Sequence, residues 1–178
     1  MRRRIAWLAS FWIVLPLSSA QQAGSKSERN MEHVEAVTDT IASWTQKEGT
    51  DTVLSLRDGR QLIILRTDPH LKVWNQAIAL QKEKRWPVYI EFEAHSRTVQ
   101  QLLLCTPREV EEVQPQASGD MTVVFRHAPS FYSLKKALPH FDDTLALLKA
   151  SAQRHTPLLI AVHPTTLEIL FASPLNGQ

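Results

Sequence analysis

Residues 52–71 read TVLSLRDGRQLIILRTDPHL, and this stretch decides the predicted fold. Two apolar runs flank Asp58-Gly59, which is a strong β-hairpin signal because glycine accepts the positive φ of a tight turn. Pro69 follows the second run, and proline is favoured in the first turn of a helix. The stretch therefore predicts two antiparallel strands and then a helix, which ends before Pro87.

The same order of elements is predicted again 70 residues later, where Thr122-Val123 matches Thr52-Val53 and Pro139-His140 matches Pro69-His70. Each unit reads strand, strand, helix, strand, strand, and neither unit is long enough to bury a large core alone. We therefore predict an α+β fold: a tandem pseudo-symmetric duplication of a ββαββ unit, in which the units share one core. The sheet is expected to be mainly antiparallel, with helices on one face.

The remaining sequence completes the predicted organisation. Met31, Val34, Val37 or Thr38, Ile41 and Trp44 recur at three- and four-residue spacing, which predicts an amphipathic helix before the first unit. The expected segments are a signal peptide (1–20), a flexible leader (21–30) and one compact domain (31–178). That domain comprises the helix (31–48), the first unit (52–113) and the second unit (120–173).

Residues 1–20 read MRRRIAWLASFWIVLPLSSA. Three arginines precede a short apolar stretch, and small residues precede the expected cleavage point after Ala20, as in secretory signal peptides. The apolar stretch is shorter than the roughly 20 residues of a membrane-spanning helix. We expect a periplasmic or secreted protein that meets the membrane only through this transient segment.

The chain has 178 residues, of which 43% are hydrophobic, and a net charge of +2. Removal of residues 1–20, which hold three arginines, changes the net charge to −1. This balance gives no reason to expect a nucleic-acid partner. Cys105 is the single cysteine, so an intramolecular disulfide is excluded, and its apolar surroundings predict a buried strand position.

The sequence contains none of the common catalytic or nucleotide-binding motifs, so no catalytic residue and no cofactor is predicted. His70 and His140 occupy matched places after helix-opening prolines. Together with His163 they form an alternative hypothesis, an exported histidine-based metal-binding protein or hydrolase. Against it, no two histidines have the usual ligand spacing on one helix or strand.

The function expected from these patterns is that of a non-catalytic binding or accessory protein of the cell envelope. It would engage a protein partner or a small ligand, and its oligomeric state is left open. A third hypothesis is an assembly protein that dimerises through an exposed sheet edge. Aromatic and cationic residues are favoured in binding surfaces, and the candidate contact residues are Arg85, Trp86, His95, Arg97, Arg126 and His127.

Overall fold

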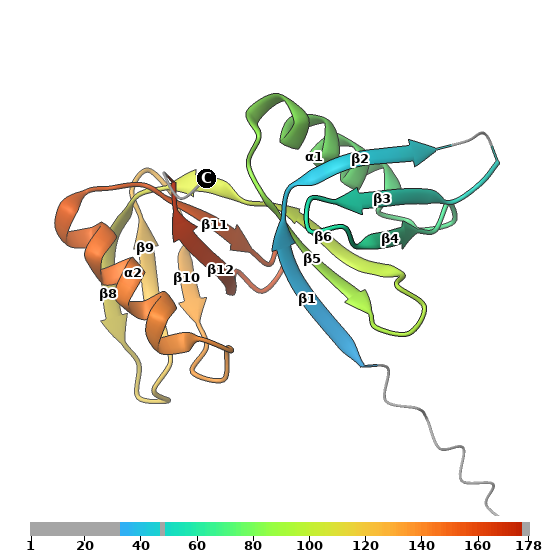
Figure 1. The fold of residues 1–178 in the computed structure, drawn as a ribbon. Helices are drawn as coiled ribbons and strands as arrows, with labels where there is room; N and C mark the ends of the chain where they lie inside the picture. The colour runs from blue at the N-terminus through green and yellow to red at the C-terminus, as the bar shows by residue number, and fades with distance from the viewer. Residues whose placement is uncertain (1–32, 47–48, 176–178) are drawn as a thin grey trace, which may run out of the picture. The chain divides into compact units, whose positions relative to one another are not determined.

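The computed structural model describes residues 33–46 and 49–175. Over these residues the chain forms two helices and twelve strands, which make four small antiparallel sheets (Figure 1). The predicted α+β class is therefore confirmed. The predicted signal peptide (1–20) and leader (21–30) lie outside the described residues.

Strand pairing divides the described elements into two groups, because each ladder joins strands of the same group. The N-terminal half contains β1 (Val34–Asp39), β2 (Ile41–Gln46), β3 (Thr52–Leu56), β4 (Gln61–Ile64), α1 (Leu71–Lys84), β5 (Val88–Glu93) and β6 (Val99–Leu104). The C-terminal half contains β7 (Thr106–Arg108), β8 (Val110–Pro115), β9 (Met121–Phe125), β10 (Phe131–Leu134), α2 (Phe141–Arg154), β11 (Leu158–Val162) and β12 (Ile169–Pro174).

The helix predicted over residues 31–48 is wrong for the described part of that range, which forms β1 and β2. Val34, Val37 and Ile41 do recur at helical spacing, but they are β-branched, and such side chains favour strands. Strand pairing decides the outcome, since β1 pairs with the distant β5 and β2 pairs with the adjacent β3.

Residues 106–115 also differ from their predicted place. The first unit was expected to extend to residue 113, but β7 pairs with β11 and β8 pairs with β9. Both strands therefore belong to the C-terminal half. The change between halves falls at Cys105, directly after β6.

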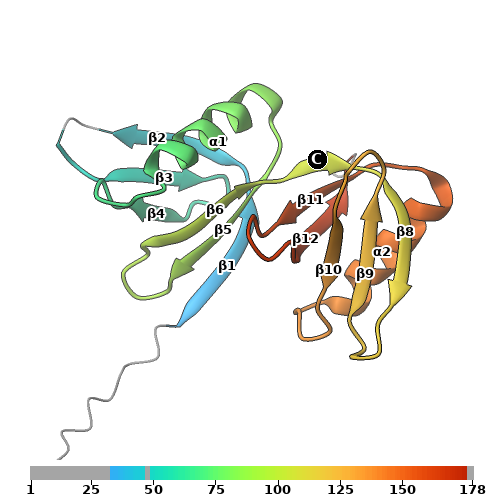
Figure 2. The ribbon, with the colours of Figure 1, turned by 180° about the vertical axis from the view of Figure 1, so that it is seen from behind.

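Each half contains two three-stranded sheets, which are linked on one side by a continuous segment and on the other by a single bridge. In the N-terminal half the chain passes from β1 to β2 through Thr40, so one segment borders both sheets. On the other side a single parallel bridge joins Ile63 of β4 to Thr98. The C-terminal half repeats this with a bridge from Ser133 to Glu168. Helix α2 packs on β8 and β12, and it lies in front of β8–β10 in Figure 1 and behind them in Figure 2.

Each half has its own hydrophobic core, rather than the single shared core that the sequence predicted. In the N-terminal half both sheets and α1 contribute fully buried side chains, such as Leu54, Ile78 and Ile90. A third, smaller cluster joins β5 to β11 and contains Tyr89, Cys105, Leu159 and Ala161. Within the described ranges, neither helix is long and apolar enough to cross a membrane.

The number of residues between a strand of the N-terminal half and its counterpart in the C-terminal half is not the same for every strand. It differs by one residue between the first and second strands of the hairpin. Thr52 pairs with Ile64 in the N-terminal half, and Met121 pairs with Leu134 in the C-terminal half. β3 thus matches β9 at a shift of 69 residues, whereas β4 matches β10 at 70. The cause is the β9–β10 loop, residues 126–130, which is one residue longer than the β3–β4 turn, residues 57–60. The predicted match of Thr52-Val53 to Thr122-Val123 is therefore wrong by one residue.

Candidate functional site

The predicted contact residues fall in three separate places. Arg85 and Trp86 follow α1, His95 and Arg97 lie in the β5–β6 loop, and Arg126 and His127 lie in the β9–β10 loop. Three of the six, Arg85, Arg97 and His127, have left-handed backbone with φ of 58°, 58° and 61°. Such backbone is costly for residues with a Cβ and is concentrated at functional sites.

The residues that follow α1 have a structural role. Arg85 ends the helix, and its N–H donates to the Gln81 carbonyl at 2.7 Å. Trp86 is half-buried and packs against the Tyr89–Cys105 cluster. The position of Trp86 therefore does not support its predicted role in partner binding.

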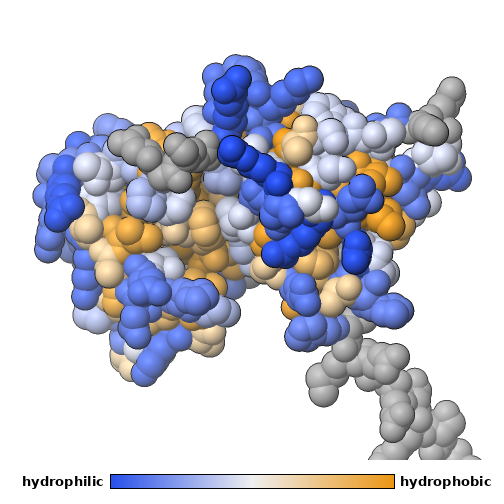
Figure 3. Space-filling view, in the orientation of Figure 1, coloured by the Kyte–Doolittle hydropathy of each residue, from blue (hydrophilic) through white to orange (hydrophobic). Residues whose placement is uncertain are grey.

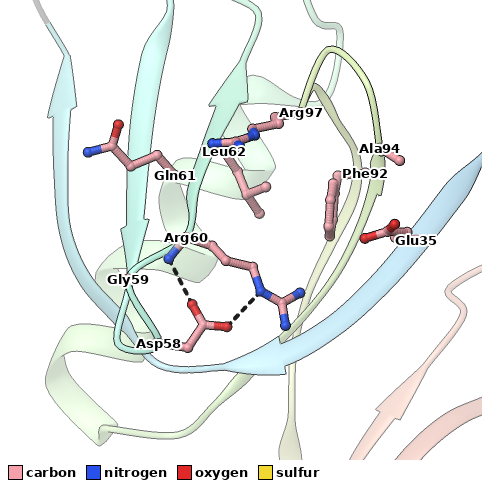
Figure 4. A pocket seen from close by; sticks show the side chains of 9 residues that line it. All are labelled: Glu35, Asp58, Gly59, Arg60, Gln61, Leu62, Phe92, Ala94 and Arg97. Atoms are coloured by element: carbon pink, nitrogen blue, oxygen red, sulfur yellow. Dashed lines mark hydrogen bonds and ion pairs between the residues drawn. The ribbon is translucent and has the colours of Figure 1, made fainter.

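A pocket of about 560 Å³ lies in the N-terminal half, between β1, the β3–β4 turn and the β5–β6 loop (Figure 4). Its apolar wall is formed by Leu62 and Phe92, which are almost fully buried. Arg60 extends into the pocket from the turn, and Arg97 and Glu35 lie at its border.

The two arginines of this pocket differ in their partners. The Asp58 carboxylate accepts the Arg60 backbone N–H at 2.9 Å and forms an ion pair with Arg60 Nε at 2.9 Å. Arg97 forms no ion pair through its guanidinium within the described residues. Among the described lining residues, Arg97 is thus the cation without an ion-pair partner. The lining has no net positive charge, because Glu35 and Asp58 balance the two arginines.

The loop that carries His95 and Arg97 is held by Glu93. Its carboxylate accepts backbone N–H groups of His95, at 3.0 Å, and of Ser96. Hydrogen bonds from the side chain and backbone of Ser96 hold the pKa of Glu93 below its usual range. The loop is thereby ordered with Arg97 in its left-handed conformation.

Replacing Arg97 by glycine is expected to raise the free energy of unfolding by about 0.5–1 kcal/mol. A left-handed residue with a Cβ costs about 1–2 kcal/mol, and glycine loses about 0.5–1 kcal/mol in chain entropy. Urea denaturation measures the change. The control is Arg57→Gly in the β3–β4 turn, where φ is not positive and glycine should destabilise. Equal effects at both positions would show that strain at Arg97 is absent.

The three histidines of the metal hypothesis are engaged separately. His70 Nδ1 lies 3.2 Å from Asp68, and its ring stacks on Trp74. His140 is the N-cap residue before α2, and its Nδ1 lies 3.8 Å from Asp143 Oδ2.

His163 Nδ1 instead accepts backbone N–H groups of Thr165 and Thr166, at 3.3 and 3.1 Å. No group of three or more His, Cys, Asp or Glu in residues 33–46 and 49–175 is arranged to hold a metal ion. The arrangement thus gives the metal hypothesis no support.

A second pocket, of about 370 Å³, lies in the C-terminal half beside the β9–β10 loop. It is lined by residues 106–109 and 125–128, which include the predicted Arg126 and His127. The lining also contains Arg108, which was not among the predicted contact residues. The Arg108 guanidinium lies 5.5 Å from the Phe125 ring centre and 5.3 Å from that of Tyr132.

Arg108 is half-buried and has no acidic partner among the described residues. Nη1 donates to the Tyr132 hydroxyl at 3.0 Å, while the buried Nε has no hydrogen-bond partner. The one acidic residue in the lining, Glu109, is bound elsewhere: its Oε1 lies 3.2 Å from both Arg126 Nη1 and His155 Nδ1. The pocket therefore contains one uncompensated guanidinium.

Comparison with known proteins identifies no relative from which a role could be transferred. No protein-family model matches the chain. No curated protein matches its sequence. No solved structure matches its fold.

Proposed function

We propose that this chain is an exported, non-catalytic binding protein that holds an acidic segment of a partner protein in the Arg108 pocket. The observation that carries the proposal is Arg108 itself, a partly desolvated guanidinium without a carboxylate. Charged groups removed from water are normally paired, because desolvation without compensation is costly. A carboxylate of a partner would supply the missing pair.

The chemistry of Arg108 suits this role. A guanidinium has five N–H donors in one plane and binds carboxylates with two parallel hydrogen bonds. Phe125 and Tyr132 fix the position of that plane, and the Tyr132 hydroxyl uses only one donor. Arg126 and His127 lie in the same lining, so they would contact flanking groups of the acidic segment.

We further propose that the two halves are copies of one unit, in which a bent strand precedes the ββαββ elements, and that each is a five-stranded barrel of the OB type. The support lies in the connectivity: β1–β2 and β7–β8 each act as one long bent strand, and both halves have the parallel bridge. Backbone details also correspond. Asp51 Oδ1 accepts the Arg66 N–H and Asp120 Oδ1 accepts the Lys136 N–H, both at 2.9 Å.

Location in the periplasm or outside the cell is part of the proposal. Its support is the signal-like sequence of residues 1–20 and the single cysteine, Cys105. An exported binding protein of this kind acts as an accessory factor for its partner.

The test is a calorimetric titration of the protein with the peptide acetyl-Glu-Glu-Glu-Glu-amide. Arg108→Gln should weaken binding about tenfold or more, as expected for loss of a charge-assisted pair. Arg108→Lys should weaken it as well, since lysine keeps the charge but lacks the planar fork. Arg154→Gln is the matched control, because this exposed arginine is not part of the pocket.

The uncharged peptide acetyl-Gln-Gln-Gln-Gln-amide distinguishes recognition of charge from nonspecific binding. It should not bind detectably. Equal binding of both peptides, or unchanged affinity in both Arg108 variants, would overturn the proposal.

A further inference from the structure

Within the residues that the structure describes, strand β2 is an unprotected sheet edge. It borders the sheet β2–β3–β4 and pairs with β3 alone among the described strands. Five of its six residues, Ala42–Gln46, are exposed. An edge of this kind presents backbone N–H and C=O groups that are free to pair with another strand.

The corresponding strand of the C-terminal half is protected by charge and by proline. β8 carries Glu111 and Glu112, and it ends with Pro115. Charges and proline on an edge strand prevent it from pairing with other chains. β2 has the sequence IASWTQ, with no charge and no proline.

The two helices also contact the edge strands β8 and β2 differently. The Val110 N–H at the start of β8 donates to Ser151 Oγ of α2 at 3.2 Å, so α2 satisfies part of that edge. No hydrogen bond joins α1 to Ile41–Gln46 within the described residues; Lys82 Nζ instead lies 5.4 Å from the Trp44 ring centre. Within the described residues, the backbone edge of β2 thus receives no hydrogen bond from its helix, whereas that of β8 receives one.

We propose that two copies of this chain associate through antiparallel pairing of their β2 strands about a twofold axis. A neutral strand suits pairing with its own copy, because directly opposed like charges would destabilise a symmetric ladder. Trp44 and Val53, each 37% exposed, add apolar area beside the edge. Figure 3 shows hydrophobic surface over this sheet. Pairing would join two three-stranded sheets into one six-stranded sheet.

The first test transfers the protection of β8 to β2. Sedimentation velocity of the purified protein should show a monomer–dimer equilibrium with a Kd of about 1–100 µM, as for a small interface. Ala42→Glu/Ser43→Glu, which copies Glu111 and Glu112, should weaken it at least about tenfold. The reciprocal variant, Glu111→Ala/Glu112→Ser, should leave the equilibrium unchanged.

The second test traps the dimer. Ser43→Cys should form a disulfide-linked dimer on mild oxidation, whereas Glu112→Cys should not. Native Cys105 does not interfere, because it is fully buried. A protein that stays monomeric at about 500 µM, well above that Kd range, would overturn the proposal. A dimer that persists in Ala42→Glu/Ser43→Glu would overturn it too.

Discussion

Phe125→Ala is expected to lower the free energy of unfolding by about 3–5 kcal/mol, the range for loss of a buried aromatic side chain. Phe125 is 1% exposed and packs edge-to-face on Tyr132, with ring centres 4.8 Å apart. Its removal leaves a cavity in the C-terminal core and takes away one of the rings that fix Arg108. Denaturation with guanidinium chloride, followed by circular dichroism, measures the loss.

The matched control is Phe131→Ala, in the strand that pairs with the one holding Phe125. Phe131 is 73% exposed, so its removal should change stability by less than about 0.5 kcal/mol. Similar losses for both variants would show that the C-terminal core is not organised as described. A large loss for Phe131→Ala alone would place that ring in an interface.

Cys105 in the folded protein is expected to react with iodoacetamide about a thousandfold more slowly near pH 8 than in the unfolded chain. Burial raises the pKa of the Cys105 thiol to about 12 from 9.0, and the thiolate is the reactive form. At a pH below both values, this change reduces the thiolate fraction about a thousandfold. Mass spectrometry of the alkylated protein over a range of pH measures the rates.

Unfolding in urea supplies the first control, since it should restore fast labelling with a midpoint near pH 9.0. A second control is Thr165→Cys in the exposed β11–β12 loop, which should react quickly without denaturant. Fast labelling of Cys105 in the folded protein would mean that the cluster between β5 and β11 opens readily.

Local sequence signals predicted the central part of each half. Asp58-Gly59 marked a real turn, and Pro69 and Pro139 each preceded a helix, because these signals act through neighbouring residues. The segment before them was misjudged, since valines and isoleucines at three- and four-residue spacing suit either a helix or a strand. The strand conformation is determined by pairing of β1 with β5, which is far along the chain, and of β2 with β3, which follows it directly.

The candidate site was predicted less completely. Exposed cations in loops, Arg97, Arg126 and His127, could be proposed from sequence and do line pockets. Arg108 could not, because its importance depends on Phe125 and Tyr132, which only the folded sheet brings to it. Its sequence neighbours Glu109, Glu111 and Glu112 give Arg108 the context of ordinary surface charge.

The single bridge that completes the wall of each half has a mechanical consequence. A barrel sealed by a full ladder resists the entry of another strand, since every rung must be exchanged. Here the two sheets of each half are joined on this side by a single bridge. It lies between Ile63 and Thr98 in the N-terminal half and between Ser133 and Glu168 in the C-terminal half. Loss of that one bridge would therefore separate the two sheets of a half along this side, while the remaining ladders stay intact.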